Sequence, residues 1–269
     1  MKPKVSVIMG IYNCADTLSE AINSIVNQTF KNWELIMCDD GSSDRTLEIA
    51  LMYANKYDNI KVYENAKNMG LNYTLNQCLK YVQGEYIARM DGDDFSIYDR
   101  FEKEVDFLDH HPEYAIVSTA MIYFDDRGDF GIGNQKEEPE LKDFSRGTPF
   151  AHAASMVRKE AYEKVEGYTV SKKYLRVEDW HLWIKMYSKG YKGYNLSEAL
   201  YKMRDDREAT NRRKFKYRFN EMRVSAFAIK SLRLPYWHYI YILRSPFIGL
   251  LPKSFYEMLH KKKVKYAKK

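Results

Sequence analysis

Short apolar runs alternate with amphipathic stretches through residues 1–94. Runs rich in β-branched and aliphatic side chains at 5–9, 34–38, 60–63 and 85–90 predict strands. Between them, apolar residues recur at helical spacing over 17–26, 47–54 and 71–82, which predicts helices. This β-α-β-α order with short links favours an α/β fold, in which helices flank both faces of a mostly parallel sheet.

The pattern is less regular after residue 95. Apolar runs at 116–121 and 156–158 predict strands, and helices are expected from 159 onward and over 178–187. Residues 125–139 are rich in Gly, Asp and Glu and predict a loop or a hairpin. We expect one domain over 1–210, with halves at 1–95 and 96–210. A helical, basic and aromatic extension is expected over 211–269.

The composition is that of a folded protein. Of the 269 residues, 45% are hydrophobic and 30% are charged, which excludes a disordered or fibrous chain, and the net charge of +6 is mild. Cys14, Cys38 and Cys78 are odd in number and far apart, which argues against a disulfide framework or a zinc ribbon. There is no signal-peptide pattern, and no apolar run reaches the ~18 residues of a membrane span, so we expect a cytoplasmic protein.

Acidic residues follow two of the predicted strands. Asp39-Asp40-Gly41-Ser42 follows the second strand, and Asp91-Gly92-Asp93-Asp94 follows the fourth. Ligands of such sheets bind beyond the carboxyl ends of the strands, so both groups are expected in one cleft if the strands are neighbours. Carboxylates two residues apart suit Mg²⁺ or Mn²⁺, although Asp and Gly are also common in solvated turns. An aspartyl-phosphatase is disfavoured, because its nucleophile pair is expected after the first strand.

Glu178 and Asp179 open the predicted helix that carries Trp180 and Trp183. The helix dipole alone favours acidic side chains at that position. The alternative is that one of the two carboxylates is a general base, which must reach the hydroxyl that it deprotonates.

Several segments, taken in order, resemble the inverting glycosyltransferases of family 2. They are 4–13 (KVSVIMGIYN), 28–30 (QTF), 38–42 (CDDGS), 68–71 (NMGL), 84–94 (GEYIARMDGDD) and 178–183 (EDWHLW). The resemblance covers about residues 3–204. It implies a GT-A (Rossmann-like) fold, in which a nucleotide-binding half and an acceptor half form one domain, and the transfer of a sugar from a UDP-sugar to a hydroxyl group.

The nucleotide-sugar contacts that the resemblance implies follow three of the strands. They are Gly10, Ile11, Tyr12, Asp39, Asp40 and Asp91. Asp40 is expected to contact the uracil with Asp39 nearby, and Asp91 is expected to meet the ribose or the metal. Asp93, with Asp94 and Asp91, is expected to hold Mn²⁺ or Mg²⁺ on the diphosphate.

The resemblance also implies the catalytic base, which is Asp179. Inversion in a single displacement needs no enzyme nucleophile, so one carboxylate must take the proton of the acceptor hydroxyl while a cation offsets the charge on the leaving diphosphate. Weaker candidates for contact with the acceptor are Glu178, His152 and Trp180.

Two positions depart from the family pattern. Leu75 stands where many members carry an arginine, so the cation that meets the diphosphate is open; the candidates are Arg89, Arg204 and Arg207. The usual Tyr-Arg-x-x-His reads Tyr-Lys-Met-Arg-Asp at 201–205, so a histidine that completes the metal site is not evident. The Gln-x-x-Arg-Trp signature of processive synthases does not occur, which predicts the transfer of a single sugar.

Residues 232–259 mix aromatic and aliphatic side chains with prolines, and lysines follow at 261–263, 265, 268 and 269. Such a stretch can lie in a membrane interface, where each lysine near an anionic surface contributes about 1 kcal/mol. The alternative is a solvated basic tail behind helices that pack on the core. We favour peripheral binding at the inner face of the cell membrane, because a lipid-linked acceptor for surface polysaccharide would require it. Nucleic acid is disfavoured, because no recognition motif accompanies the charge.

Two other functions stay open at this point. A nucleotide-sugar-binding scaffold would bind UDP but neither transfer nor hydrolyse any UDP-sugar. A nucleotidyltransferase would share the α/β layout, but a Gly-rich loop with an arginine is expected after its first strand, and residues 10–13 read Gly-Ile-Tyr-Asn.

Overall fold

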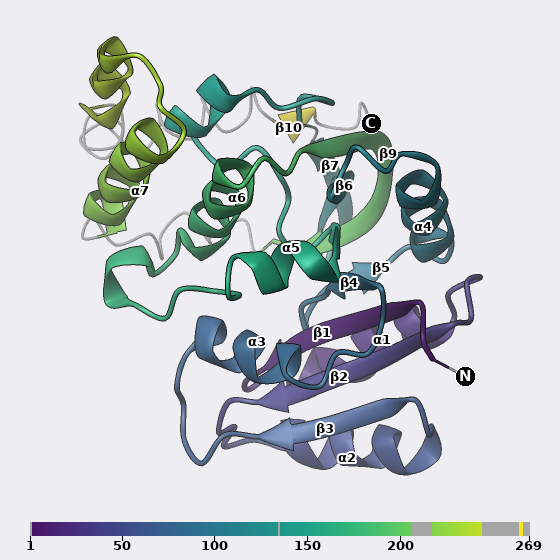
Figure 1. Ribbon diagram of the computed structural model, residues 1–269. Helices are drawn as coiled ribbons and strands as arrows, with labels where there is room; N and C mark the ends of the chain where they lie inside the picture. Colours follow the sequence, from purple (N-terminus) through teal and green to yellow (C-terminus); the bar gives the residue numbers. More distant parts are fainter. Residues whose placement is uncertain (1, 134, 206–216, 244–263, 266–269) are drawn as a thin grey trace.

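The computed structural model describes residues 2–133, 135–205, 217–243 and 264–265 (Figure 1). The first half folds as its periodicity predicts, into β1 (Val5–Ile11), α1 (Ala15–Val26), β2 (Trp33–Asp39), α2 (Thr46–Lys56), β3 (Ile60–Glu64), α3 (Leu71–Leu79) and β4 (Tyr86–Arg89). The strand order is β3-β2-β1-β4, and each neighbouring pair is parallel. The α/β class is therefore confirmed, and this part of the sheet is parallel as expected.

The second half extends the same sheet. Its elements are β5 (Phe95–Ser96), α4 (Arg100–His110), β6 (Ile116–Asp125), β7 (Gly128–Gly133), η1 (Leu141–Ser145), β8 (Ser155–Arg158), α5 (Lys159–Lys164), η2 (Lys172–Tyr174), α6 (Glu178–Ser188), β9 (Gly193–Arg204), α7 (Arg218–Ser231), η5 (Tyr236–Leu243) and β10 (Val264–Lys265). β8 pairs antiparallel with β4 and β6, and β6 and β7 form a hairpin, which was one of two predictions for 125–139. β9 runs parallel to β6 and pairs with β5, so the whole sheet is mixed.

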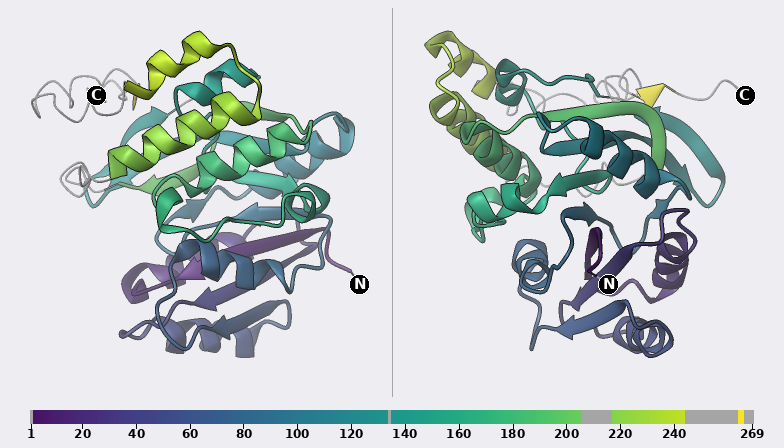
Figure 2. Two further views of the ribbon diagram at one scale, coloured as in Figure 1. Left: turned by 60° about the vertical axis from the view of Figure 1, so that its left-hand side comes forward. Right: turned by 45° about the vertical axis from the view of Figure 1, so that its right-hand side comes forward.

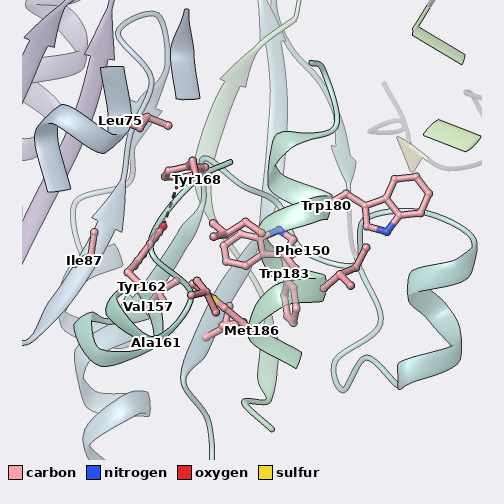
Figure 3. Close-up of a cluster of buried hydrophobic side chains, with 14 of the residues drawn as sticks. Leu75, Ile87, Phe150, Val157, Ala161, Tyr162, Tyr168, Trp180, Trp183 and Met186 are labelled. Carbon is pink, nitrogen blue, oxygen red and sulfur yellow. Dashed lines mark hydrogen bonds between the residues drawn. The ribbon is translucent and has the colours of Figure 1, made fainter. Parts of the chain in front are cut away.

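Alternating side chains of the central strands serve two hydrophobic cores, one on each face of the sheet, as the two-residue period of a strand requires. Val7 and Met9 of β1 pack in the core with α1, α2 and α4, whereas Ile8 packs in the core with α3, α5, α6 and α7. Figures 1 and 2 show these two sets of helices on opposite faces, and Figure 3 shows the second core around Trp183 and Phe150. Full burial of one such side chain stabilises the fold by about 1.5–3 kcal/mol.

Helix α7 shares the second core with α6. Val224 and Ala228 are fully buried there, and Asn220 donates a hydrogen bond to the carbonyl oxygen of Leu175 at 3.0 Å. The predicted boundary between 1–210 and 211–269 stays a prediction, but the helix that follows it packs on the acceptor half. In the part of the chain that the structure describes, no helix is both long and apolar enough to cross a bilayer.

Candidate active site

Three strand ends meet at one edge of the sheet. β1 lies between β2 and β4, so the acidic residues after β2 and after β4 stand on either side of the segment that follows β1. Neighbouring strands are about 4.8 Å apart, which separates the ends of β2 and β4 by about 10 Å. The sequence predicts a shared cleft if β2 and β4 are neighbours. They are separated by β1, but their carboxyl ends lie at the same edge of the sheet.

Close packing explains two glycines at this edge. A Cβ atom on Gly10 would approach Leu71 and Thr74 of α3 to 3.2 and 3.3 Å, and one on Gly92 would lie 2.8 Å from Cys14 Sγ. The turn after β4 therefore lies directly against the start of α1. Within the predicted base-pocket segment 10–12, Ile11 is buried in the core, whereas Tyr12 is 49% exposed. The base-pocket role of this segment stays a prediction.

Asp39 and Asp40 are buried and hold two loops in place. The Asp39 carboxylate accepts hydrogen bonds from the backbone N–H groups of 41–42 at 3.0 and 2.9 Å. The Asp40 carboxylate accepts from the backbone N–H groups of 69–70, both at 2.8 Å, and from Asn65 Nδ2 at 2.9 Å. These bonds give both side chains a structural task, and the contact of Asp40 with uracil stays a prediction.

Asp91, Asp93 and Asp94 form an acidic cluster in the turn after β4. One carboxylate oxygen from each lies within 4.8 Å of the others. Asp93 is exposed and Asp91 half-buried, whereas Asp94 is 4% exposed. Desolvation and the charge of Asp91 raise the pKa of Asp93, and burial with the charges of both neighbours raises that of Asp94. Oxygen donors in this arrangement fit Mg²⁺ or Mn²⁺, because a divalent cation would relieve the repulsion between the carboxylates.

Strand β9 fixes this turn through hydrogen bonds. The backbone N–H of Arg204 donates to Asp94 Oδ1 at 2.8 Å, and the hydroxyl of Tyr201 donates to Asp94 Oδ2 at 2.9 Å. The Arg204 guanidinium donates to the carbonyl oxygen of Asp93 at 3.1 Å and pairs with Glu20 at 2.9 Å. Arg204 thus lies beside the cluster, and its contact with phosphate stays a prediction. The other candidate, Arg207, lies outside the described residues.

Arg89 connects the acidic cluster with the second half of the site. Its side chain is buried and forms an ion pair with Asp91. Among the described residues, its Nε–H has no hydrogen-bond acceptor. Its positive charge lowers the pKa of both Asp93 and Asp179, in each case against the larger effect of burial. One buried cation therefore acts on both the candidate metal ligand and the candidate base.

Asp179 lies in the first turn of α6, as expected from the sequence. Burial raises the pKa of this half-buried carboxyl group, while hydrogen bonds from the Trp180 N–H and from Thr148 lower it. The adjacent Glu178 is half-buried too, and burial followed by the charge of Asp179 raises its pKa. A carboxylate whose pKa is raised binds a proton more strongly than an exposed one, which suits a general base.

His152 lies beside two tyrosines. Its Nε2 lies 2.7 Å from the hydroxyl of Tyr168, which lies 3.1 Å from that of Tyr162; Figure 3 draws the contact between the tyrosines. Burial, with a smaller effect of the Arg89 charge, lowers the pKa of His152 well below its ordinary value. The charge of Asp179 contributes to the raised pKa of Tyr168, after the larger effects of burial and of Tyr162. Of these three residues, Tyr168 therefore lies near the candidate base, and acceptor contact by His152 stays a prediction.

Trp180 points away from this group (Figure 3). Its side chain is buried, and its Nε1–H donates to the carbonyl oxygen of Phe144 in η1 at 2.9 Å. Trp180 therefore joins α6 to η1, and the geometry offers no support for its predicted contact with the acceptor.

Three residues of the site were not predicted from the sequence. Thr148 and Tyr168 lie in segments without regular periodicity, and Tyr201 lies on a strand that the apolar pattern does not predict. For Tyr201 a signal was available, because it opens the 201–205 segment that corresponds to the family's Tyr-Arg-x-x-His.

Comparison with known proteins identifies the family. The sequence model of Glycosyl transferase family 2 matches residues 6–166, which is more than half of the chain. The chain belongs to this family and is therefore a glycosyltransferase. EpsE of Bacillus subtilis (strain 168), which carries a glycosyltransferase name, is 46% identical over 263 residues, or 97% of this chain and 95% of EpsE.

A second relative has a more specific name. It is the Escherichia coli UDP-Gal:alpha-D-GlcNAc-diphosphoundecaprenol beta-1,3-galactosyltransferase, 33% identical over 276 residues, or 98% of this chain and 97% of the relative. Both relatives match along nearly their whole length.

Solved structures confirm the GT-A fold. S. aureus TarS 1-349 in complex with UDP-GlcNAc superposes with a TM-score of 0.71 at 23% identity, over 96% of this chain and 77% of TarS. The mannosyltransferase PcManGT from Pyrobaculum calidifontis, in complex with GDP-Man and Mn²⁺, superposes with a TM-score of 0.63 at 17% identity, over 97% of this chain and 80% of PcManGT. At these identities the likeness concerns the fold alone.

Proposed function

We propose that this glycosyltransferase moves one sugar from a UDP-sugar to a hydroxyl group, with inversion at the anomeric carbon and with Mn²⁺ or Mg²⁺ as cofactor. The observation that carries the proposal is the position of Arg89, whose buried charge acts on both Asp93 and Asp179. A single displacement needs two carboxylates. One, here Asp93, binds the cation that neutralises the diphosphate, and the other, here Asp179, takes the proton of the acceptor hydroxyl.

Each of these side chains has a separate task in the transfer. Asp179 accepts the proton of the attacking hydroxyl, and its burial makes it a stronger base than an exposed aspartate. Arg89 limits that rise in pKa, so that the base stays ionised over a wider pH range. Asp91 and Asp93 would hold the divalent cation, which supplies charge neutralisation for the leaving diphosphate.

The comparisons support the choice of donor and acceptor. UDP-galactose stands in the name of the E. coli relative, and the TarS structure contains UDP-GlcNAc. The acceptor in the E. coli name is a sugar on diphosphoundecaprenol. We infer that this chain also uses a UDP-sugar and a lipid-linked saccharide, in the biosynthesis of a surface polysaccharide such as capsule, O-antigen or exopolysaccharide.

The outer edge of η5 supports action at a membrane surface. Residues three apart share an edge of a 3₁₀ helix, and Trp237, Ile240 and Leu243 on one edge are 60%, 66% and 51% exposed. On another edge, His238 Nδ1 lies 2.9 Å from Ser145 Oγ and attaches η5 to η1. Exposed aromatic and aliphatic side chains of this kind are typical of interfacial binding, so we infer peripheral attachment at the inner face of the cell membrane. The lysines that follow in the sequence at 261–269 lie, apart from 264–265, outside the described residues.

Asp179→Asn tests the base. The variant should lose transfer to an acceptor while it retains UDP binding, because Asn keeps the shape of the side chain but cannot take a proton. Glu178→Gln, at the same helix end, is the matched comparison, because loss of transfer in this variant but not in Asp179→Asn would assign the base to Glu178 instead. Transfer by Asp179→Asn at nearly the wild-type rate would show that Asp179 is not the base.

Asp93→Ala tests the metal site. Calorimetry should show that UDP affinity no longer rises when Mn²⁺ is added, and an unchanged response to Mn²⁺ would refute the metal role. A panel of UDP-sugars, screened for slow hydrolysis in the presence of Mn²⁺, identifies the donor. A wild-type chain that binds UDP but neither transfers nor hydrolyses any of them would be a scaffold.

A further inference from the structure

We propose that Tyr201 is a positioning residue of the metal site, because its hydroxyl fixes the turn of the acidic cluster so that Asp91 and Asp93 can bind one cation together. The inference rests on the proposed function, since it assumes that this cluster binds a divalent cation.

The Tyr201 hydroxyl joins the two ends of the turn. It donates to Asp94 Oδ2 at 2.9 Å and accepts from the backbone N–H of Asp91 at 3.2 Å. Tyr201 is fully buried on β9, which pairs antiparallel with β5 immediately after the turn. A single hydroxyl group therefore sets the spacing between residues 91 and 94, and Asp93 lies between them.

Asp94 is the member of the cluster that faces inward. Both of its carboxylate oxygens accept hydrogen bonds from β9, one from the Arg204 backbone at 2.8 Å and one from Tyr201. Its side chain is 4% exposed, whereas Asp93 is exposed and Asp91 half-buried. We therefore assign Asp94 to anchoring the turn, and Asp91 and Asp93 to the cation. This narrows the metal set expected from the sequence, which also contained Asp94.

A buried arginine holds the Tyr201 ring in place. The Arg100 guanidinium lies 5.0 Å from the centre of that ring and donates to the carbonyl oxygens of Arg89 and Ser155, both at 3.2 Å. Arg89 immediately precedes the turn, so Arg100 supports both the strand end and the tyrosine. A phenylalanine at position 201 would keep the ring and its contact with Arg100, and would remove only the hydroxyl.

The test is Tyr201→Phe, with Mn²⁺ binding measured directly. The electron paramagnetic resonance signal of free Mn²⁺ gives the affinity of the chain for the ion in the presence of UDP, without turnover. We expect about tenfold weaker Mn²⁺ binding, within the range found for residues that orient metal ligands. Hydrolysis of the donor should then need more Mn²⁺ to reach its maximum, while the maximal rate stays within about threefold of wild type.

Tyr86→Phe is the matched control. Tyr86 is also buried, its hydroxyl donates to the carboxylate of Asp109 at 2.5 Å, and its ring centre lies 5.4 Å from the Arg158 guanidinium. It opens β4, whereas the acidic turn follows the other end of that strand. Tyr86→Phe should lower the melting temperature but leave Mn²⁺ affinity unchanged.

The outcomes separate the two proposals. Mn²⁺ binding by Tyr201→Phe equal to wild type, or an equal loss in both variants, would overturn the role of Tyr201 and leave the proposed function standing. A wild-type chain that binds no Mn²⁺ in the presence of UDP would overturn both.

Discussion

Arg89 and Asp91 form an ion pair that is buried at one end and open at the other. The side chain of Arg89 is 3% exposed and that of Asp91 is 32% exposed. Because both residues lie at the end of β4, the guanidinium charge acts on Asp93 in the same turn and also on Asp179 at the start of α6. The buried charge of Arg89 thereby lowers the pKa of one carboxyl group in each half of the site.

Because the charge of Arg89 lowers the pKa of Asp179, the pH dependence of the transfer rate should shift in Arg89→Met. This variant removes the charge but keeps much of the side-chain length. Burial already raises the pKa of Asp179, and the loss of a nearby cation raises it further. The base works only when it is ionised, so the rising limb of transfer rate against pH should move to higher pH. This is checked by measuring kcat at saturating Mn²⁺ and donor at a series of acidic pH values.

Arg89→Lys is the control for this prediction. It keeps a positive charge, although the ammonium group cannot reproduce the planar geometry of guanidinium. In Arg89→Lys the transfer rate should rise with pH over nearly the same pH range as in wild type, even if the maximal rate is lower. If Arg89→Met and Arg89→Lys show the same limb, the charge of Arg89 does not tune the base.

The contact between Gly92 and Cys14 gives a second prediction. A Cβ atom at position 92 would lie 2.8 Å from Cys14 Sγ, and the φ angle of Gly92 is not positive, so the conflict is purely steric. Gly92→Ala should lower the free energy of unfolding by roughly 1–3 kcal/mol through overpacking and weaken UDP binding by displacing the acidic turn. Urea unfolding and calorimetry check the two effects.

A double variant makes this prediction sharper. Cys14→Ala removes the sulfur atom that the new methyl group would meet, so Gly92→Ala combined with Cys14→Ala should regain most of the lost stability and affinity. If the losses of stability and UDP affinity in the two single variants simply add in the double variant, the effect of Gly92→Ala arises from the backbone and not from contact with Cys14.

The periodicity of the sequence predicts the first half of the fold well, for a physical reason. Strands covered on both faces read as continuous apolar runs, as in residues 35–38, and amphipathic helices between them have a clear period. Two of the longer elements, α4 and β9, were not predicted, and their sequences are less regular. In α4, Phe101, Val105 and Leu108 follow helical spacing but are surrounded by charged residues.

Strand β9 could not be predicted from its own residues. It contains 197–199, Ser-Glu-Ala, in its middle, and it becomes a strand because it pairs with β6 over nearly its whole length. The residues of the site likewise divide into those that local sequence patterns can predict and those that only strand pairing brings together. Asp93 and Asp179 stand directly after a strand and at a helix start, where sequence patterns are informative. Tyr201 contacts Asp94 across 107 residues of chain, which only the pairing of β5 with β9 brings about.

The exposed edge of η5 gives a third prediction. Trp237→Ser combined with Ile240→Ser should weaken binding to vesicles that contain anionic lipid by at least about tenfold, since burial of each side chain contributes about 1.5–3 kcal/mol. Sedimentation with vesicles measures this. Tyr98→Ser is the matched control, because Tyr98 is 63% exposed and follows β5, outside η5. Equal binding by both variants would exclude this edge as the membrane contact.

The raised pKa of Glu104 predicts how the free energy of unfolding depends on pH. This fully buried side chain pairs with Arg100 at 3.1 Å, and burial raises its pKa from 4.5 to about 7, against the smaller effect of Arg100. Between these two values the folded chain keeps a proton on Glu104 that the unfolded chain has lost. The folded state therefore binds more protons, and stability falls as pH rises through this range.

Glu104→Gln isolates this contribution, because Gln does not titrate. The free energy of unfolding of wild type, measured by urea at successive pH values, should fall relative to that of Glu104→Gln by up to about 3 kcal/mol as the pH rises through the range from 4.5 to 7, and the difference should become constant about one pH unit above 7. A difference that is constant over the whole range would mean that Glu104 has the same pKa in the folded and unfolded chains. Arg100 would then compensate fully for the burial of the carboxylate, and the support behind Tyr201 would be an ordinary ion pair at every pH in that range.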